Sequence, residues 1–248
     1  MENGIVEYVD GLPTIRVLDK GFVTLEDSMG GDLRTVNAAK VSNKKRSKEM
    51  GPGEEKLIRY LMAHKHTSPF EHTMFTFYVK VPLFVIREWH RHRTWKFNEV
   101  SGRYVVFDPE FYVPALLRVP AATNKQGSVF PESVEDIATI TSWHSKEVWN
   151  DWARDAIGEA FGGAFGIYGA LLEEGVAKEM ARMVLPLNLY TEMFATIDAH
   201  NLMKFIELRN APDAQWEIQQ YAKALEEFFK MKMPVTYEAW KDATRAIG

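Results

Sequence analysis

The sequence predicts a mixed α/β fold, on two kinds of hydrophobic periodicity and on the size of the chain. Apolar residues recur at helical spacing in some segments and alternate with polar ones in another, so helices and at least one strand are expected. The 248 residues are 46% hydrophobic and 26% charged, and no Pro-, Gly- or Ser-rich linker divides them. This is enough apolar material for a full core. We expect a single domain over residues 1–248, with residues 1–15 as an N-terminal extension.

The N-terminal half contains the clearest helix and strand patterns. Four apolar residues between 57 and 62 recur at helical spacing after Pro52-Gly53, which predicts a helix. Residues 73–81 alternate between apolar and polar, which predicts a strand. Pro82 suits the first turn of a second helix, expected from Leu83 to about Trp95. Three segments show neither pattern and are expected to be loops or arms: residues 1–15, 42–53 and 108–131.

The C-terminal half is predicted to be mainly helical. Residues 133–136 (SVED) form a capping-box start for a long helix through Trp152, and Asp213 can cap a helix through Phe228. Residues 157–172 are apolar, with three glycines four residues apart. The segment is too short for a membrane span, and glycines allow close backbone approach. We therefore expect a buried, closely packed helix or a contact between subunits.

The overall composition excludes several classes of function. Thirty Lys and Arg against 34 Asp and Glu give a net charge of -4, so no general binding of nucleic acid or of a membrane surface is expected. The chain has no cysteine, which excludes disulfides, thiolate metal sites and a cysteine nucleophile. Its start shows no basic region leading into an apolar core. We expect no secretion signal and a cytoplasmic protein.

Positive charge is nevertheless concentrated in one segment. From Lys80 to Arg103 six Lys and Arg face only two acidic residues, a local net charge of +4, and five of the seven histidines lie between residues 64 and 92. Within the expected helix, Arg91, His92 and Arg93 would point about 100° apart. Three adjacent donors that point three ways suit a ligand with several polar groups.

Four interpretations of this segment stay open. It is a solvated charged face; a metal site formed by His64, His66, Glu71 and His72, although the HExxH and deaminase signatures are absent; a single-strand nucleic-acid surface; or a site for an anionic small molecule. We favour the last, because arginines bind phosphate bidentately and Ser101-Gly102-Arg103 adds a hydroxyl and a flexible backbone. The chain has neither GxxxxGK[ST] nor GxGxxG, so side chains would hold a nucleotide.

Arg91-His92-Arg93, followed by seven residues and Ser101, resembles the RHRx7S signature of the flavin-dependent thymidylate synthases. The resemblance extends over nearly the whole chain from about residue 17. Its other segments are Leu18–Phe22, Ala38–Ser42, Ser68–His72, Asn98–Tyr104, Leu185–Tyr190 and Ala214–Ile218.

The resemblance implies a largely antiparallel sheet flanked by helices and an enzyme that converts dUMP to dTMP. It implies methylenetetrahydrofolate as carbon donor, FAD as hydride carrier, NADPH as reductant, and a homotetramer whose active sites combine subunits. The missing cysteine agrees with this family, because the unrelated class of thymidylate synthase needs a cysteine nucleophile.

The resemblance also implies the site residues, and it implies no metal. The dUMP-binding residues would be Glu88, Trp89, His90, Arg91, Glu99, Val100, Ser101, Gly102, Arg103, Arg182 and Arg209. The FAD-binding residues would be His66, Ser68, Arg91, His92, Arg93, Glu99, Asp198, Ala199, His200 and Lys204. Arg209 would be the catalytic residue, which favours the anionic form of the uracil ring.

The chain departs from the family pattern at several positions. Asp198-Ala199-His200 and Lys204 stand where the family usually has Asn-Ala-Arg and another Asn, so an Asp198–Lys204 interaction is expected. Glu88 replaces a usual glutamine, and Arg87 or Arg91 would have to offset its charge. The segment 151–168 is also longer than in compact members. These changes leave open a flavin- or nucleotide-binding protein without turnover, with a metal-bound hydrolase as a third alternative.

Overall fold

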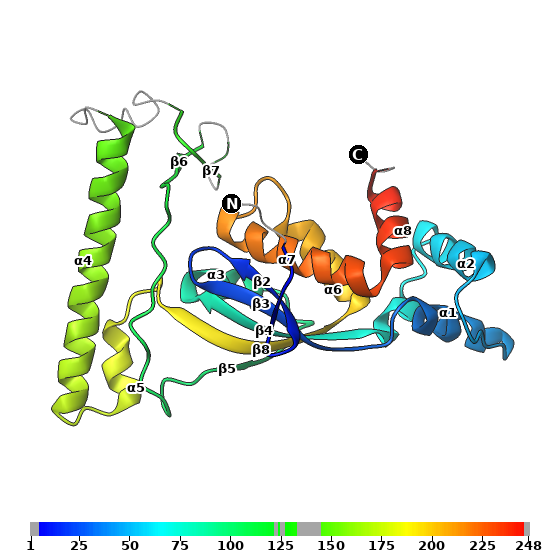
Figure 1. Ribbon diagram of the computed structural model, residues 1–248, viewed down its shortest axis with the longest axis horizontal. Coiled ribbons are helices and arrows are strands. Elements are labelled where there is room, and N and C mark those ends of the chain that lie inside the picture. Colours follow the sequence, from blue (N-terminus) through cyan, green and yellow to red (C-terminus); the bar gives the residue numbers. More distant parts are fainter. Residues whose placement is uncertain (1–4, 122–123, 125–126, 133–144, 246–248) are drawn as a thin grey trace.

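A six-stranded antiparallel sheet forms the centre of the molecule in the computed structural model, which describes residues 5–121, 124, 127–132 and 145–245. The strand order is β1-β2-β3-β4-β8-β5 (Figure 1). The strands are β1 (Glu7–Val9), β2 (Leu12–Val17), β3 (Gly21–Met29), β4 (Met74–Pro82), β8 (Tyr190–Asp198) and β5 (Lys96–Glu99). This confirms the expected mixed α/β fold with an antiparallel sheet flanked by helices.

The helices form three groups around the sheet. Figure 1 shows α3, α6 and α7 over one face, α1, α2 and α8 at one end, and α4 with α5 at the other end. The helices are α1 (Asp32–Lys40), α2 (Pro52–Ala63), α3 (Leu83–Trp89), α4 (Lys146–Glu173), α5 (Lys178–Ala181), α6 (Ala199–Arg209), α7 (Trp216–Lys232) and α8 (Pro234–Arg245). Shorter pieces are the 3-10 turns η1 (Val41–Asn43), η2 (Ser68–His72) and η4 (Arg182–Val184) and the two-residue strands β6 (Val119–Pro120) and β7 (Ser128–Val129).

The core lies between the sheet and the covering helices. Phe75 and Phe77 on β4 are fully buried, as the alternation of residues 73–81 predicts, and Phe77 packs against Phe228 of α7. The helix predicted after Pro52-Gly53 is confirmed as α2, which buries Ile58 and Leu61. Fully buried strand and helix residues of this kind supply most of the free energy that holds a domain together.

The second predicted helix is shorter than expected. α3 ends at Trp89 instead of about Trp95, and Pro82 is its N-cap and the last residue of β4. A continued helix would place Trp95 about 240° around the axis from Trp89. The chain instead turns, and the two indoles pack edge to face with their ring centroids 5.4 Å apart. Both also contact Phe205, at 5.1 Å for Trp89 and 5.2 Å for Trp95. Burial of Trp95 in the same cluster therefore outweighs one more helical turn.

The expectation that the first 15 residues are irregular is wrong. β1 and β2 form a hairpin in which Val9 pairs with Leu12. The two turn residues, Asp10 and Gly11, both have positive φ angles of 50° and 81°. Asp-Gly with this geometry is a preferred two-residue hairpin turn.

Two predicted helix starts also need correction. α7 begins at Trp216 with Gln215 as N-cap, so Asp213 does not cap it. Residues 133–144, including the predicted SVED start, lie outside the described residues. In the part of the chain that the structure describes, α4 begins at Lys146 with the Ser145 side chain accepting from the backbone N–H of Val148.

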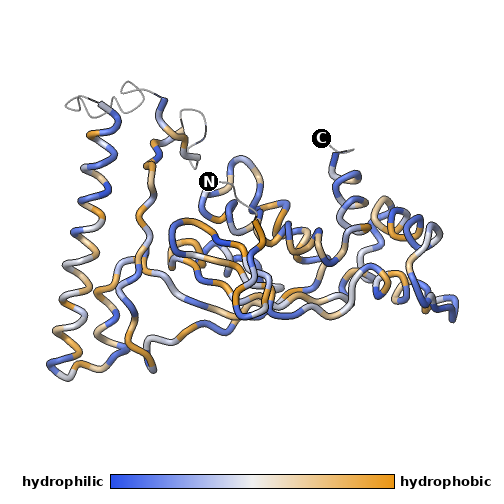
Figure 2. The backbone as a smooth tube through the Cα atoms, viewed as in Figure 1, coloured by the Kyte–Doolittle hydropathy of each residue, from blue (hydrophilic) through white to orange (hydrophobic). Residues whose placement is uncertain are grey.

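The glycine-containing segment 157–172 belongs to α4, and its glycines are not closely packed within this chain. Five glycines, at 158, 162, 163, 166 and 169, face open space where a side chain would stand. Trp152 and Ile167 are more than half exposed, and Figure 2 shows hydrophobic residues interspersed along the helix. Close packing around the glycines is therefore wrong for a single chain, whereas Phe161 and Tyr168 of the same segment are buried. No described helix is long and apolar enough to cross a membrane.

Candidate functional site

The predicted cationic segment folds as a turn between α3 and β5. Arg91 and Arg93 are exposed, and within the described residues neither side chain has a carboxylate within ion-pair distance. The helix expected to spread these donors around its axis is absent here, because α3 has already ended at Trp89. A tight turn nevertheless leaves both guanidinium groups accessible to an anion.

One end of this turn is anchored by Arg209, the last residue of α6. Its Nη1 donates to the Glu88 carboxylate at 2.7 Å, its Nη2 to the Glu88 carbonyl at 2.9 Å, and its Nε to Nε2 of His92 at 2.9 Å. Burial, together with the Arg209 charge, lowers the pKa of His92 to about 4. His92 is therefore neutral at neutral pH and can accept this hydrogen bond. The charge that offsets Glu88 is thus Arg209, whereas Arg87 or Arg91 was expected.

The Ser101-Gly102-Arg103 loop follows β5 directly. Val100 N–H donates to the Glu192 carbonyl at 2.9 Å, which fixes where the loop begins. A Cβ at Gly102 would overlap the ring of Phe107 and lie 3.0 Å from Cδ of Arg182. The glycine thus lets Arg182 pack against the loop backbone, which brings Arg182 to the three loop residues that are also predicted to bind phosphate.

Charge around this loop is only partly balanced. Arg103 Nε lies 3.2 Å from the Glu179 carboxylate, and both side chains are more than half exposed. Exposed pairs of this kind are weak and exchange readily for a stronger anion. Arg182 is exposed, and no described carboxylate lies within ion-pair distance of it. Arg103 and Arg182 are therefore both available to bind a phosphate group.

Other predicted nucleotide contacts lie along the same segment. Glu99 sits on β5 opposite Met193 and accepts a hydrogen bond from Thr191 Oγ1 at 2.9 Å. His90 is exposed, with its ring edge on Phe97. The Trp89 side chain is fully buried in the core, so a contact from Trp89 would have to come from its backbone.

Asp198, Ala199, His200 and Lys204 cluster at the start of α6. The Asp198 carboxylate accepts from the backbone N–H of Asn201 at 2.9 Å and from its side-chain amide at 2.7 Å. The expected Asp198–Lys204 pair is therefore wrong, because N-capping of α6 occupies the carboxylate. Burial and then the Lys204 charge lower the pKa of His200. Lys204 itself is exposed.

His66 and Ser68 lie just beyond α2, where the chain enters η2. Tyr60 and His64 stack with ring centroids 4.0 Å apart, and His66 approaches the same tyrosine at 6.0 Å. His66 and Ser68 are both exposed. The described residues contain no group of three or more His, Cys, Asp or Glu side chains that could hold a metal ion.

The predicted residues fall at two ends of β8 within one chain. The loop Ser101–Arg103, here named the phosphate loop after its predicted ligand, follows Val100, which lies beside Glu192 near the first residue of β8. Asp198 is the last residue of this strand. The eight steps of about 3.4 Å from the first to the last residue of β8 separate these ends by roughly 27 Å. Lys96 pairs with Thr196, so the Arg91–Arg93 turn lies toward the Asp198 end.

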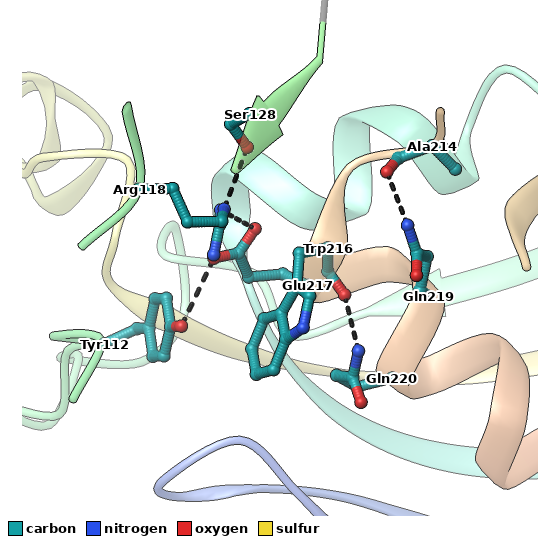
Figure 3. Close-up of polar contacts among 8 residues, drawn as sticks. All are labelled: Tyr112, Arg118, Ser128, Ala214, Trp216, Glu217, Gln219 and Gln220. Atoms are coloured by element: carbon teal, nitrogen blue, oxygen red, sulfur yellow. Dashed lines mark hydrogen bonds and ion pairs between the residues drawn. The ribbon is translucent and has the colours of Figure 1, made fainter. Parts of the chain in front are cut away.

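A buried ion pair that sequence reasoning missed ties the 108–131 segment to α7. Arg118 Nη2 donates to both Glu217 oxygens at 2.8 Å, its Nε donates to Ser128 at 2.9 Å, and Tyr112 donates to Glu217 at 3.2 Å (Figure 3). Glu217 is only 2% exposed. A nearby cavity of about 300 Å³, lined mainly by apolar side chains, contains none of the predicted site residues. Glu217 lies in the Ala214–Ile218 segment, but no sequence pattern indicates that Arg118, 99 positions away, is its partner.

The arrangement presents exposed arginine side chains and one glycine-containing loop, which is the surface expected of a protein that binds polyanionic ligands. Comparison with known proteins specifies it further. Residues 24–235 match the family described as "Thymidylate synthase complementing protein". The chain is 47% identical to a flavin-dependent thymidylate synthase of Thermus thermophilus, over 94% of this chain and 80% of that protein.

Further relatives agree. Identity is 45% to the flavin-dependent thymidylate synthase of Kosmotoga olearia, over 91% of this chain and 92% of that one. A crystal structure of the UMP/dUMP methylase PolB from Streptomyces cacaoi, bound with 5-Br dUMP, superposes with a TM-score of 0.76 at 36% identity and covers 92% of this chain and 97% of that chain. The chain belongs to the flavin-dependent thymidylate synthases, which confirms the family, the fold class and the flavin-dependent enzyme class predicted from the sequence.

Proposed function

We propose that this chain reductively methylates dUMP to dTMP, with methylenetetrahydrofolate as carbon donor, FAD as hydride carrier and NADPH as reductant. The observation that carries the proposal is the RHRx7S segment. It forms an exposed cationic turn followed by a loop in which Gly102 admits Arg182. One segment thus supplies cationic surface for two anionic ligands.

The described residues fit FAD by the chemistry of their donors. Arg91, Arg93 and Lys204 are exposed cations without a carboxylate at ion-pair distance among the described side chains, and a pyrophosphate group needs such donors. His66, Ser68, His92, Glu99, Asp198, Ala199 and His200 complete the proposed FAD contacts. When bound, FAD supplies the hydride that reduces the transferred carbon unit.

The dUMP phosphate is proposed to bind Ser101, the Gly102 backbone, Arg103 and Arg182. Binding would exchange the Arg103–Glu179 pair for a phosphate contact, because that pair is exposed. Glu88, His90, Arg91, Glu99, Val100 and the Trp89 backbone would contact the remainder of dUMP. Arg209 would stabilise negative charge on the uracil ring by hydrogen bonding.

We also propose that the chain acts as a homotetramer with active sites shared between copies. The FAD end and the phosphate end of β8 are separated within one chain by roughly 27 Å. Apolar side chains on α4 are exposed, and on the open face of the sheet Phe194 is 44% exposed. Surfaces of this kind are typical of contacts between subunits. Association would bring the two ends of different copies together.

The direct test is tritium release from [5-³H]dUMP with NADPH and methylenetetrahydrofolate, with and without FAD. FAD-dependent release that accompanies dTMP formation is expected. Flavin and dUMP binding without release would instead support a non-catalytic binding protein. UMP serves as a parallel substrate, because the solved relative is described as a UMP/dUMP methylase.

The proposed role of Arg209 has its own test. Arg209→Ala should reduce dTMP formation to background, and FAD content measured by absorbance should remain that of the wild type. Retained turnover in this variant would show that ring activation does not depend on Arg209.

A further inference from the structure

We propose that Glu88 and His92 are positioning residues that clamp the Arg209 guanidinium in one orientation. The inference rests on the proposed function, in which Arg209 acts on the uracil ring. It assigns to His92 a role beyond flavin contact and gives the family-atypical Glu88 a purpose.

The clamp consists of three hydrogen bonds from three different nitrogens. Nε donates to His92, Nη1 donates to the Glu88 carboxylate, and Nη2 donates to the Glu88 backbone carbonyl. A planar guanidinium held at all three nitrogens can neither rotate about its stem nor tilt. Arg209 is 121 positions from Glu88 and 117 from His92, so the tertiary fold creates this arrangement.

The clamp leaves a defined pair of donors free. Arginine has five N–H groups, and the three contacts use one on each nitrogen. One N–H remains on Nη1 and one on Nη2. Since the Arg209 side chain is only 13% exposed and its plane is held by the three contacts, these two N–H groups have fixed directions. Donors of fixed direction suit a ring anion whose charge is shared by several atoms.

His92 is suited to be an acceptor by its surroundings. Its ring packs edge-on to Phe205 at 4.7 Å, and the charged groups that act on it are Arg209 and Glu88. Burial and Arg209 hold the pKa of His92 at about 4, so the ring stays neutral and Nε2 keeps its lone pair. The proton then resides on Nδ1, which leaves that edge available for another contact.

Glu88 supplies the opposite side of the clamp. Its carboxylate is 42% exposed, and its contact to Arg209 uses one oxygen. The carboxylate offsets the arginine charge, so the remaining N–H groups of Arg209 act through their direction more than through net charge. A glutamine at this position would keep an acceptor oxygen without the charge.

Two matched pairs of variants separate acceptor function from side-chain bulk. His92→Phe keeps a ring against Phe205 and removes the acceptor, whereas His92→Gln loses the ring and keeps an acceptor. Glu88→Leu removes the acceptor at similar size, whereas Glu88→Gln keeps it. All four retain the backbone carbonyl of residue 88.

We expect kcat at saturating FAD to fall about ten- to a hundredfold in His92→Phe and Glu88→Leu, because each loses a hydrogen bond to a charged group. His92→Gln and Glu88→Gln keep an acceptor, so each should lose at least about threefold less kcat than its matched partner, His92→Phe or Glu88→Leu. KM for dUMP should not change in the two His92 variants, since His92 is assigned to flavin and not to dUMP. In an Arg209→Lys background His92→Phe should cause no further loss, because the clamped group is already gone.

Wild-type kcat in His92→Phe, or equal losses in both members of either pair, would overturn the proposal. A purely structural role would lower thermal stability of both His92 variants without this acceptor-specific split in kcat. The affinity of each variant for FAD is measured separately. A lower kcat that results from a lost contact between His92 Nδ1 and FAD is thereby distinguished from loss of the clamp.

A second measurement does not depend on turnover. In ¹⁵N-histidine-labelled protein, with His92→Gln for assignment, His92 should be neutral with its proton on Nδ1 from about pH 5 to about pH 8. A ring that titrates near the ordinary value, or one protonated on Nε2, would overturn the clamp. If the wild type releases no tritium from dUMP, the proposed function fails while this spectrum still decides the geometry.

Discussion

At the residue scale, Gly102 determines how closely Arg182 approaches the phosphate loop. Any side chain there would meet Phe107 and the Arg182 stem. When a methyl group is added to a tightly packed site, the surrounding side chains have to move. The loop therefore depends on the absence of a side chain at this position.

Gly102→Ala should raise the Kd for dUMP by about tenfold or more, because displacement of Arg182 loses part of a charge-assisted contact. Equilibrium dialysis with labelled dUMP measures this. FAD content is the control, since the proposed flavin residues lie elsewhere. An unchanged Kd would show that Arg182 does not reach the phosphate.

His92 also predicts a pH dependence of stability. Its pKa is lowered from 6.5 to about 4 in the folded chain, so between these values the unfolded chain binds more protons. The free energy of unfolding should therefore decrease as pH falls from about 6.5 to about 4. Urea unfolding at pH 7 and pH 5 of wild type and His92→Phe tests this, and the variant should show the smaller decrease. Equal decreases would contradict the lowered pKa.

At the element scale, the Arg118–Glu217 pair fastens the described part of the 108–131 segment to the first turn of α7. Arg118 also lies over the rings of Phe130 and Trp216, at 5.8 and 5.5 Å. The acidic residue stands where the helix dipole favours negative charge. One buried pair thus holds a segment that has little regular structure of its own.

Arg118→Leu should lower the free energy of unfolding by about 3 to 5 kcal/mol, because it leaves Glu217 buried without its partner. The double variant Arg118→Leu/Glu217→Leu should lose less, since no uncompensated charge remains. Urea denaturation of both proteins provides the comparison. A double variant less stable than Arg118→Leu would show that the pair itself stabilises the fold.

Elements with strong periodicity could be predicted from the sequence, whereas their ends could not. α2 and β4 carry unbroken patterns of period 3.6 and 2. The end of α3 depends on where Trp95 is buried, which is a tertiary effect. The β1–β2 hairpin was missed although Asp10-Gly11 signals its turn. Within the site, the resemblance supplied residue identities, but the Glu88–Arg209 contact joins residues 121 positions apart and no local pattern indicates it.

At the scale of the whole molecule, the proposed phosphate and flavin contacts lie at opposite ends of β8. We therefore expect each active site to need residues from two copies of the chain. The Arg182 side chain belongs to one end and His200 to the other. If each site takes these groups from different copies, one variant can supply what the other lacks.

Arg182→Ala and His200→Ala should each be nearly inactive, and a refolded equimolar mixture should recover up to about a quarter of wild-type activity, because random assembly pairs two intact ends at that frequency. Activity of the mixture against each parent is the measurement. A mixture no more active than its parents would indicate that each site is built within one chain.

The length of β8 also lets the two halves of the ligand surface change independently. Charges about 27 Å apart are separated by about three screening lengths at physiological ionic strength. The substitutions at Asp198, His200 and Lys204 all lie near one end of β8. They can therefore change the affinity for the cofactor with little electrostatic effect on the phosphate loop. The length of the strand therefore allows substitutions among the proposed flavin contacts without a change in the charge that the substrate phosphate meets.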